Sequence, residues 1–382
     1  MTIKVADRGR VPPFIVMDVM VAAAQRQDTH GDMLPLMVGQ PSTSAPQGAL
    51  DAAKRALDTD TLGYTLALGR PSLRDRLARH YRETYGVDVG ADRIAITQAS
   101  SGGFILAFLS AFDAGDRVAL ASPSYPAYRN ILKALGIEAV LLEATAATRY
   151  QPTPAMLAAL DPPVDGLIVA SPANPTGTML HADEMAGLVS YCEASGIRLV
   201  SDEIYHGITY GKPAVTAAAY GDQAIVVSSF SKYYSMTGWR IGWMVLPEDL
   251  IRPVDCLQGN LFVSASALAQ HAAEAAFDCT EELEANVKRY AANRSLLLEA
   301  LPKAGFDRLA PAEGAFYLYA DVAHLTNDSV AFCRRMLAAT GVAATPGTDF
   351  DPTRGHATMR FSFAGATDDM AEAADRLQRW LG

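Results

Sequence analysis

One lysine follows an apolar stretch and is surrounded by groups that could hold a phosphorylated ligand. Lys232 comes shortly after the apolar run 224–227, and desolvation beside such a run lowers the pKa of an amine and makes it a nucleophile. Ser229 precedes the lysine and Arg240 follows it; a hydroxyl and a guanidinium are groups that bind phosphate. The pattern predicts a lysine that binds a phosphorylated aldehyde. The alternative is an ordinary exposed lysine in a polar loop.

A carboxylate follows another apolar run. Asp202 comes after the stretch 197–200, and a carboxylate at the end of a buried strand is unfavourable unless it is paired. A protonated pyridine nitrogen would be a suitable partner. On local sequence alone, an aspartate at the N-cap of a helix explains the position equally well.

Three more positions carry groups that suit a flat, phosphorylated ligand. Asn174 lies in the segment 171–177 (SPANPTG), where two prolines and a glycine fix a turn that aims the amide, although a structural Asx-turn is the alternative. The segment 100–103 (SSGG) opens a predicted helix, so its free N–H groups could bind phosphate, or simply cap an ordinary helix. It matches no nucleotide-binding motif. Tyr125 could stack on a ring or pack in the core.

Alternating apolar strands and helices position these residues. Between residues 90 and 245 the predicted helices include 101–111 and 181–193. The predicted strands are 93–97, 117–121, 139–142, 166–170, 197–201, 224–227 and 241–246. Such continuous apolar strands predict an α/β fold with a mostly parallel sheet and helices on both faces. The polar residues fall at the carboxyl ends of strands, where such sheets bind ligands.

The pattern changes after a long helical region, 268–301. Strands are predicted at 315–320 and 358–363, and helices at 329–339 and 368–381. This mixture predicts a smaller α+β domain completed by the N-terminal segment. We therefore expect a large domain, 47–285, and a smaller domain formed by 1–46 and 286–382.

Composition restricts the class of protein. The 382 residues are 50% hydrophobic, with a net charge of −10, which argues against nucleic acid or an anionic membrane as the main partner. The four cysteines are scattered without the spacing of a zinc site and fit a reducing compartment. Neither a signal peptide nor a membrane-spanning apolar run is evident. We expect a cytoplasmic protein without a metal.

Three motifs give the chain a specific resemblance. They are SPANPTG (171–177), SDEIY (201–205) and SFSKYYSMTGWRIG (229–242). Through them the chain resembles, nearly end to end, the class I/II aminotransferases, which are fold-type-I enzymes dependent on pyridoxal 5′-phosphate (PLP). The resemblance implies an enzyme that moves an amino group between an L-amino acid and a 2-oxo acid.

The resemblance also implies roles for individual residues. Lys232 would form the internal aldimine with the cofactor and move the α-proton, and Asp202 would pair with the pyridine nitrogen. Asn174 and Tyr205 would hydrogen bond to the ring 3-oxygen. Further cofactor contacts are implied for Ser100, Ser101, Gly102, Tyr125, Ile204, Ser229 and Arg240.

Substrate and subunit contacts follow from the same resemblance. Arg360, with Asn174 and Gly39, would bind the substrate α-carboxylate. Alternation in 358–363 sets Arg360 apart from the apolar residues, although a solvent-facing arginine would show the same pattern. Tyr64 resembles the tyrosine that reaches the phosphate of the partner subunit, which implies a homodimer with shared active sites.

The sequence departs from some members of the family in two ways. One aspartate-using branch of the family has a lysine where this chain has Gly102 and Gly103, and no second arginine can be assigned to a side-chain carboxylate. Both departures put aspartate in doubt as the preferred donor.

Two alternative functions remain. A PLP-dependent lyase would use the same cofactor residues. A regulatory domain is the other alternative, but the chain is acidic and has no helix-turn-helix region. The donor and the acceptor are not identified by the sequence.

Overall fold

A seven-stranded sheet forms the centre of the larger part of the molecule. The computed structural model describes residues 3–382, and the strands of this sheet follow the order β2-β8-β7-β6-β5-β3-β4. Their bounds are β2 (Ile94–Thr97), β3 (Arg117–Ser122), β4 (Glu138–Glu143), β5 (Gly166–Ala170), β6 (Arg198–Asp202), β7 (Ile225–Ser229) and β8 (Gly242–Val245). Within this sheet, as described, β8 runs in the direction opposite to the other six strands. The prediction of a mostly parallel sheet is confirmed.

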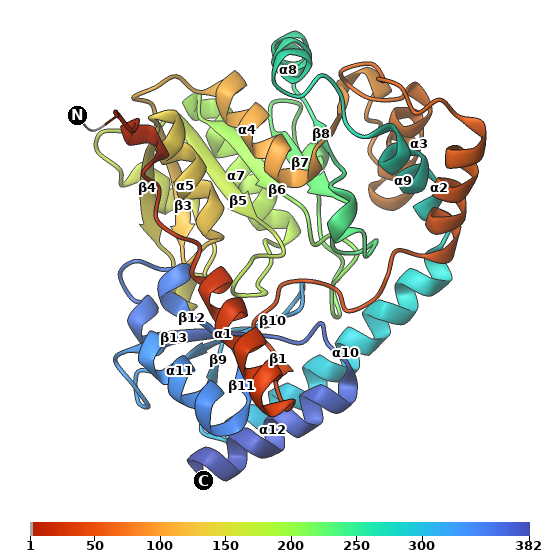
Figure 1. Ribbon diagram of the computed structural model, residues 1–382. Coiled ribbons are helices and arrows are strands. Elements are labelled where there is room, and N and C mark those ends of the chain that lie inside the picture. Colours follow the sequence, from red (N-terminus) through yellow and green to blue (C-terminus); the bar gives the residue numbers. More distant parts are fainter. Residues whose placement is uncertain (1–2) are drawn as a thin grey trace.

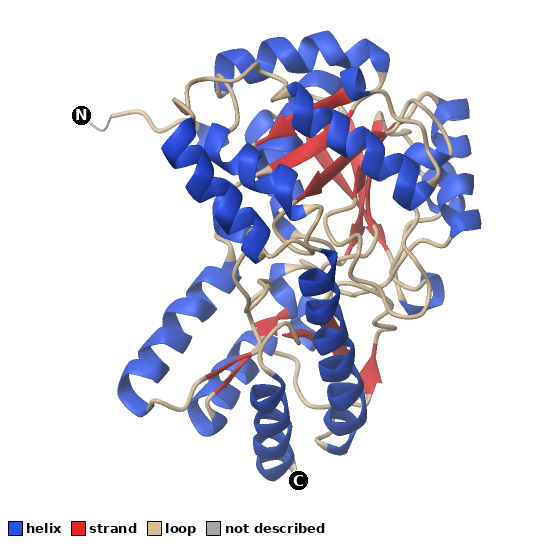
Figure 2. Ribbon diagram, turned by 90° about the vertical axis from the view of Figure 1, so that its right-hand side faces the viewer, coloured by secondary structure: helices blue, strands red, loops and turns tan. Residues whose placement is uncertain are grey.

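Helices cover both faces of this sheet (Figures 1 and 2), as its continuously apolar strands require. On one face lie α4 (Ala99–Ala111), α5 (Pro126–Leu135) and α8 (Glu248–Leu261). The helices that share the core of the other face are α2 (Gln47–Thr59), α3 (Pro71–Tyr85), α7 (Ala182–Ser195) and α9 (Ala267–Ala276). Helix α4 approaches the sheet closely, because a Cβ at Gly103 would lie 3.0 Å from Cγ1 of Val227.

A second sheet with its own core lies below the first in Figure 1. Its strand order is β12-β13-β10-β9, with antiparallel neighbours. The bounds are β9 (Arg308–Leu309), β10 (Tyr317–Asp321), β12 (Thr345–Pro346) and β13 (Thr358–Ser362). Helices α11 (Ser329–Thr340) and α12 (Thr367–Leu381) accompany this sheet.

The N-terminal segment packs with this smaller part. Strand β1 (Leu34–Pro35) pairs in parallel with β11 (Val342–Ala343), and α1 (Ile15–His30) precedes β1. Helix α10 (Thr280–Lys303) runs from the large sheet region to the small one (Figure 1). The boundary expected near residue 285 falls inside α10, and the division into two domains stays a prediction.

The helical region predicted at 268–301 consists of two helices with a break. Helix α9 ends at Ala276, and α10 begins at Thr280. The N–H groups of Asp278 and Cys279 bond to carbonyls three residues back, which tightens the chain into a turn. Phe277 turns into the core against Phe230. No helix within residues 3–382 combines the length and the apolar composition needed to cross a bilayer.

The strand ends that carry the polar segments meet at one edge of the large sheet. Strand β2 is antiparallel to β8, and β8 is antiparallel to β7, so β2 points the same way as β7. The carboxyl ends of β2, β3, β5, β6 and β7 therefore face the same region.

Candidate active site

A cavity of about 780 Å³ lies at this edge of the sheet, within the size range of cofactor and substrate sites. Side chains from the large sheet, from α1 and from the small sheet line it. The predicted site residues among them are Gly39, Ser100, Ser101, Tyr125, Asn174, Asp202, Ile204, Tyr205, Lys232, Arg240 and Arg360. Residues far apart in the sequence are thus brought together in one cavity.

Three of the predicted site residues do not line the cavity. Gly102 lies in the first turn of α4, where its N–H donates to the Gln98 carbonyl at 3.2 Å. Oγ of Ser229 accepts the N–H of Ser231 at 3.1 Å. Ser231, and not Ser229, lines the cavity. Tyr64 lies on the surface with 88% of its area exposed.

Asp202 ends β6 as a buried carboxylate. Oδ1 accepts the N–H of Ile204 at 3.1 Å, and Oδ2 accepts the hydroxyl of Tyr128. Burial raises the pKa of Asp202 to about 6, against the opposing effects of these hydrogen bonds and of the Lys232 charge. Turns follow Asp202, and no helix begins there, so the N-cap explanation is wrong. A buried carboxylate of this kind favours a cationic partner in the cavity.

Lys232 reaches the cavity from the loop after β7. Its Nζ donates to the carbonyl of Gly39 at 2.7 Å. Burial, together with the charges of Arg360 and Arg240, lowers the pKa of Lys232 to about 8, while Asp202 opposes the shift. A useful fraction of this amine is therefore neutral near neutral pH, as a nucleophile or base requires.

Arg360 is 4% exposed, so the alternative of a solvent-facing arginine is wrong. Its Nη1 donates to Oδ1 of Asn174 at 2.8 Å, and its Nη2 donates to the Met37 carbonyl at 2.7 Å. The guanidinium lies 4.4 Å from the ring centre of Tyr317. The Asn174 oxygen is therefore occupied by Arg360, which leaves the amide N–H₂ as a donor.

One donor of Arg360 remains open. Its Nε is buried and has no hydrogen-bond partner within residues 3–382. A buried N–H without an acceptor is unfavourable by about 1–3 kcal/mol. The hydrogen bonds of Nη1 and Nη2 hold the guanidinium in place. With Nε unpaired, the arginine is suitable for binding a ligand carboxylate.

Another part of the cavity lining offers groups for an anion. Helix α4 has no side-chain N-cap, so its first N–H groups are open to a ligand. Ser100 and Ser101 belong to that first turn. Arg240 has a left-handed backbone, with φ of 53°, and its Nη1 donates to the Thr237 carbonyl at 3.0 Å. This combination suits a phosphate group.

Two tyrosines of the site were not predicted from the sequence. Tyr128 holds Asp202 from α5. Tyr317 Oη lies 2.6 Å from Tyr205 Oη, and a Cβ at Gly39 would lie 2.2 Å from the same Tyr317 atom. Neither tyrosine belongs to a distinctive motif. The alternation of β10 was the only signal for Tyr317.

An apolar wall, also not predicted, comes from α1 and the segments on either side of it. Its members are Phe14, Val16, Met17, Met20 and Val38. A distant carboxylate fixes the start of α1, because Asp349 accepts the N–H groups of Ile15 at 3.1 Å and Val16 at 3.2 Å. The N-terminus of a helix favours negative charge, so the Asp349 carboxylate stabilises the start of α1.

The fold and the cavity, with a buried carboxylate, a lysine and an arginine in its lining, are those of an enzyme. The chain belongs to the aminotransferase class I and II family, whose model matches residues 31–377. It is 54% identical to valine–pyruvate aminotransferase of Mycobacterium tuberculosis, over 100% of this chain and 99% of that protein. The family consists of PLP-dependent enzymes, and this chain is an aminotransferase.

Solved structures agree with this assignment. A crystal structure of an aminotransferase from Mycobacterium tuberculosis has a TM-score of 0.98 at 54% identity, covering 100% of this chain and 99% of that one. Aspartate aminotransferase from Thermus thermophilus with maleate has a TM-score of 0.93 at 28% identity, covering 99% and 100% of the two chains. The predicted fold class and enzyme class are confirmed.

Proposed function

We propose that this aminotransferase binds PLP at the carboxyl edge of the large sheet and transfers the amino group of an apolar L-amino acid to a small 2-oxo acid such as pyruvate. The observation that carries the proposal is the single cavity in which Asp202, Lys232 and Arg360 meet the apolar wall of α1. The name of the 54% identical relative, valine–pyruvate aminotransferase, supports the same substrates.

The residues of the cavity fit PLP. The buried Asp202 carboxylate suits a ring N–H, the open start of α4 with Arg240 suits the phosphate, and Tyr125 is available to stack on the ring. When bound, PLP supplies an aldehyde for the amine and a ring that accepts negative charge from the α-carbon of the substrate.

The chain's own groups then have distinct tasks. Lys232, the one lysine of the described lining, would hold the cofactor through its aldehyde and would be the base that takes the proton from the α-carbon of the substrate. Asp202 keeps the ring nitrogen protonated. Arg360 binds the α-carboxylate and fixes the direction of the Cα–H bond toward Lys232, which lowers the entropic part of the barrier.

The lining also restricts the side chain of the donor. The charged residues that line the cavity within 3–382 are Asp202, Lys232, Arg240 and Arg360. Each has a proposed contact with the cofactor or the α-carboxylate, so none remains for a second carboxylate. An acidic side chain beside Met17 and Met20 would find no charged partner there among the described residues.

We therefore expect valine or another aliphatic amino acid, paired with pyruvate, to exceed aspartate in kcat/KM by at least about 10²-fold. Initial rates with a panel of amino acids and a fixed concentration of pyruvate give the ratio. Aspartate equal to valine in kcat/KM would contradict the proposed donor class.

The α1 wall can be tested in the same panel. Met17→Lys introduces an unpaired charge and should lower kcat/KM for valine by about 10-fold, while the loss for aspartate should be smaller. Met17→Leu is the matched control, because it preserves volume and polarity and should change kcat/KM little. A loss that is equal for both donors would exclude Met17 from the side-chain subsite.

We also propose a homodimer in which Tyr64 completes the phosphate site of the partner subunit. Tyr64 is 88% exposed, and exposed apolar side chains occur nearby at Leu66 (63%) and Val263 (47%). The Thr65 N–H donates to Oγ of Ser264 at 3.4 Å, so these two segments are neighbours. Exposed apolar groups of this extent favour an interface.

Mixed dimers test the shared site. Chains carrying Lys232→Ala and chains carrying Tyr64→Ala, unfolded and refolded together in equal amounts, should regain up to about a quarter of the wild-type activity, because half of the dimers would contain one intact site. A mixture of Lys232→Ala with Asp202→Asn is the control and should stay inactive, since both residues line the cavity of the same chain. Absence of recovery in the first mixture, measured at limiting PLP, would show that Tyr64 does not act across subunits.

A further inference from the structure

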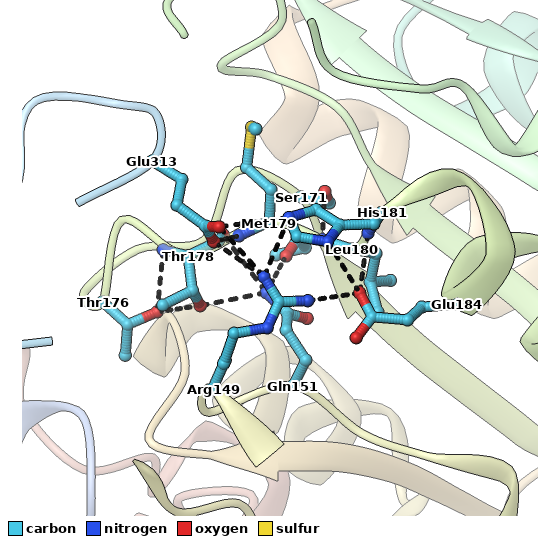
Figure 3. Close-up of polar contacts among 11 residues, drawn as sticks. Arg149, Gln151, Ser171, Thr176, Thr178, Met179, Leu180, His181, Glu184 and Glu313 are labelled. Carbon is cyan, nitrogen blue, oxygen red and sulfur yellow. Dashed lines mark hydrogen bonds and ion pairs between the residues drawn. The ribbon is translucent and has the colours of Figure 1, made fainter. Parts of the chain in front are cut away.

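A cluster of charged side chains joins the two sheet regions outside the cavity (Figure 3). The Arg149 cluster consists of Arg149, His181, Glu184 and Glu313. Nη1 of Arg149 donates to Oε1 and Oε2 of Glu313 at 3.0 and 3.1 Å, and its Nη2 donates to Glu184. Nε2 of His181 lies 3.1 Å from Oε1 of Glu313. One guanidinium thus bridges two carboxylates from different parts of the chain.

Through Glu313, the cluster is bonded to the turn that carries Asn174. Oε2 of Glu313 accepts the N–H of Met179 at 3.0 Å. The carbonyl of Gly177 accepts the N–H groups of Glu313 and Gly314 at 2.8 and 2.9 Å. Gly177 has φ of +69°, and a Cβ there would lie 3.0 Å from the Tyr317 carbonyl. The turn and the segment 312–317 are therefore tightly packed and directly bonded.

The segment 312–317 then leads into the cavity. Tyr317, at the start of β10, lies under the Arg360 guanidinium, and β10 pairs with β13, which carries Arg360. Arg360 in turn donates to Oδ1 of Asn174. Glu313 is thus connected through these contacts both to Asn174 and to Arg360. The hydrogen bond between Arg360 and Asn174 joins the contacts into one network.

We infer that the Arg149–Glu313 pair is a positioning element for the substrate carboxylate. It holds the Asn174 turn of the large part against the β10–β13 strands of the small part, and so sets the spacing of the two groups that would face the carboxylate. The inference rests on the proposed roles of Asn174 and Arg360. The side chains of Arg149 and Glu313 are 25% and 22% exposed, so water screens the pair only in part.

The test measures binding of a carboxylate that cannot react. 3-Methylbutanoate has the carbon skeleton of valine without its amino group, and its Kd for the PLP-loaded enzyme can be measured by calorimetry. Arg149→Met and Glu313→Gln should each raise this Kd by about 5- to 10-fold, and the double variant should show no further increase, because both changes break the same contact. The Kd for PLP should change less than twofold in all three variants.

Arg198→Met is the matched control. Arg198 is 22% exposed at its side chain and pairs with Asp249 at 2.7 Å, but it lies at the start of β6, on the edge of the sheet opposite the cavity. It should leave the Kd for 3-methylbutanoate within twofold of wild type. If Arg198→Met and Arg149→Met raised the Kd for 3-methylbutanoate equally, general destabilisation would explain the effect and the inference would be wrong.

Arg360→Met separates this inference from the proposed function. If Arg360→Met weakens 3-methylbutanoate while Arg149→Met and Glu313→Gln do not, the positioning role is wrong and the proposed carboxylate site stands. If Arg360→Met has no effect, both fail. Glu313→Gln preserves shape, so it keeps the test valid should Arg149→Met not fold.

Discussion

Lys232→Ala is expected to lower kcat by at least about 10³-fold, because the variant loses both the attachment point for the cofactor and the base that moves the α-proton. Lys232 is the one lysine in the described lining of the cavity, so no neighbouring amine can substitute for it. The kinetic measurement should be paired with borohydride reduction and mass spectrometry, which should detect PLP fixed to Lys232 in the wild type and no adduct at this site in the variant.

Lys212→Ala is the control for this experiment. Lys212 is exposed and does not line the cavity, so its removal should leave kcat and the reduced adduct unchanged. Substantial turnover by Lys232→Ala, or an adduct at another lysine of the wild type, would refute the assignment.

Asp202→Asn is expected to lower kcat by about 10³-fold while leaving the fold intact. The amide has the shape of the carboxylate but no charge, so the ring nitrogen would lose the partner that keeps it protonated and the ring would accept less negative charge. Tyr128→Phe removes only a hydrogen bond to the same carboxylate and should reduce kcat by about 10-fold or less. Equal losses in the two variants would argue against a special role for the charge of Asp202.

The same carboxylate should make cofactor affinity depend on pH. Burial raises the pKa of Asp202 to about 6 without a ligand, so the carboxyl is protonated below that pH. It must then release its proton before it can pair with a ring cation, and binding is linked to proton release. The affinity of the apoprotein for PLP should fall as the pH drops below about 6, by up to tenfold per unit. Asp202→Asn should keep only the pH dependence that comes from Lys232, whose pKa is about 8, and should lack the additional slope below about 6.

Much of this arrangement could be predicted from the sequence because most strands of the large sheet are buried on both faces. Its strands are short continuous apolar runs, and polar residues such as Asp202 and Asn174 interrupt the pattern where the strands end. Two-residue strands such as β1 and β11 have no periodicity to detect. They are fixed by tertiary pairing.

The apolar wall of the site could not be predicted for a different reason. Met17 and Met20 are exposed apolar residues on a surface helix, and only the tertiary fold brings them to the cavity. Tyr128 has the sequence pattern of an ordinary core residue in α5. Its contact with Asp202 depends on how α5 packs on the large sheet, which no local motif encodes.

The two ends of the chain and its middle contribute different groups to the cavity. Phe14 and Met17 come from the start of α1 and its N-cap, and Arg360 comes from β13, whereas Asp202 and Lys232 come from the end of β6 and the loop after β7. The donor contacts proposed for α1 can therefore be altered without changing the residues proposed to act on the cofactor. For protein engineering, α1 is thus a segment that can be exchanged as a unit while Asp202 and Lys232 stay in place.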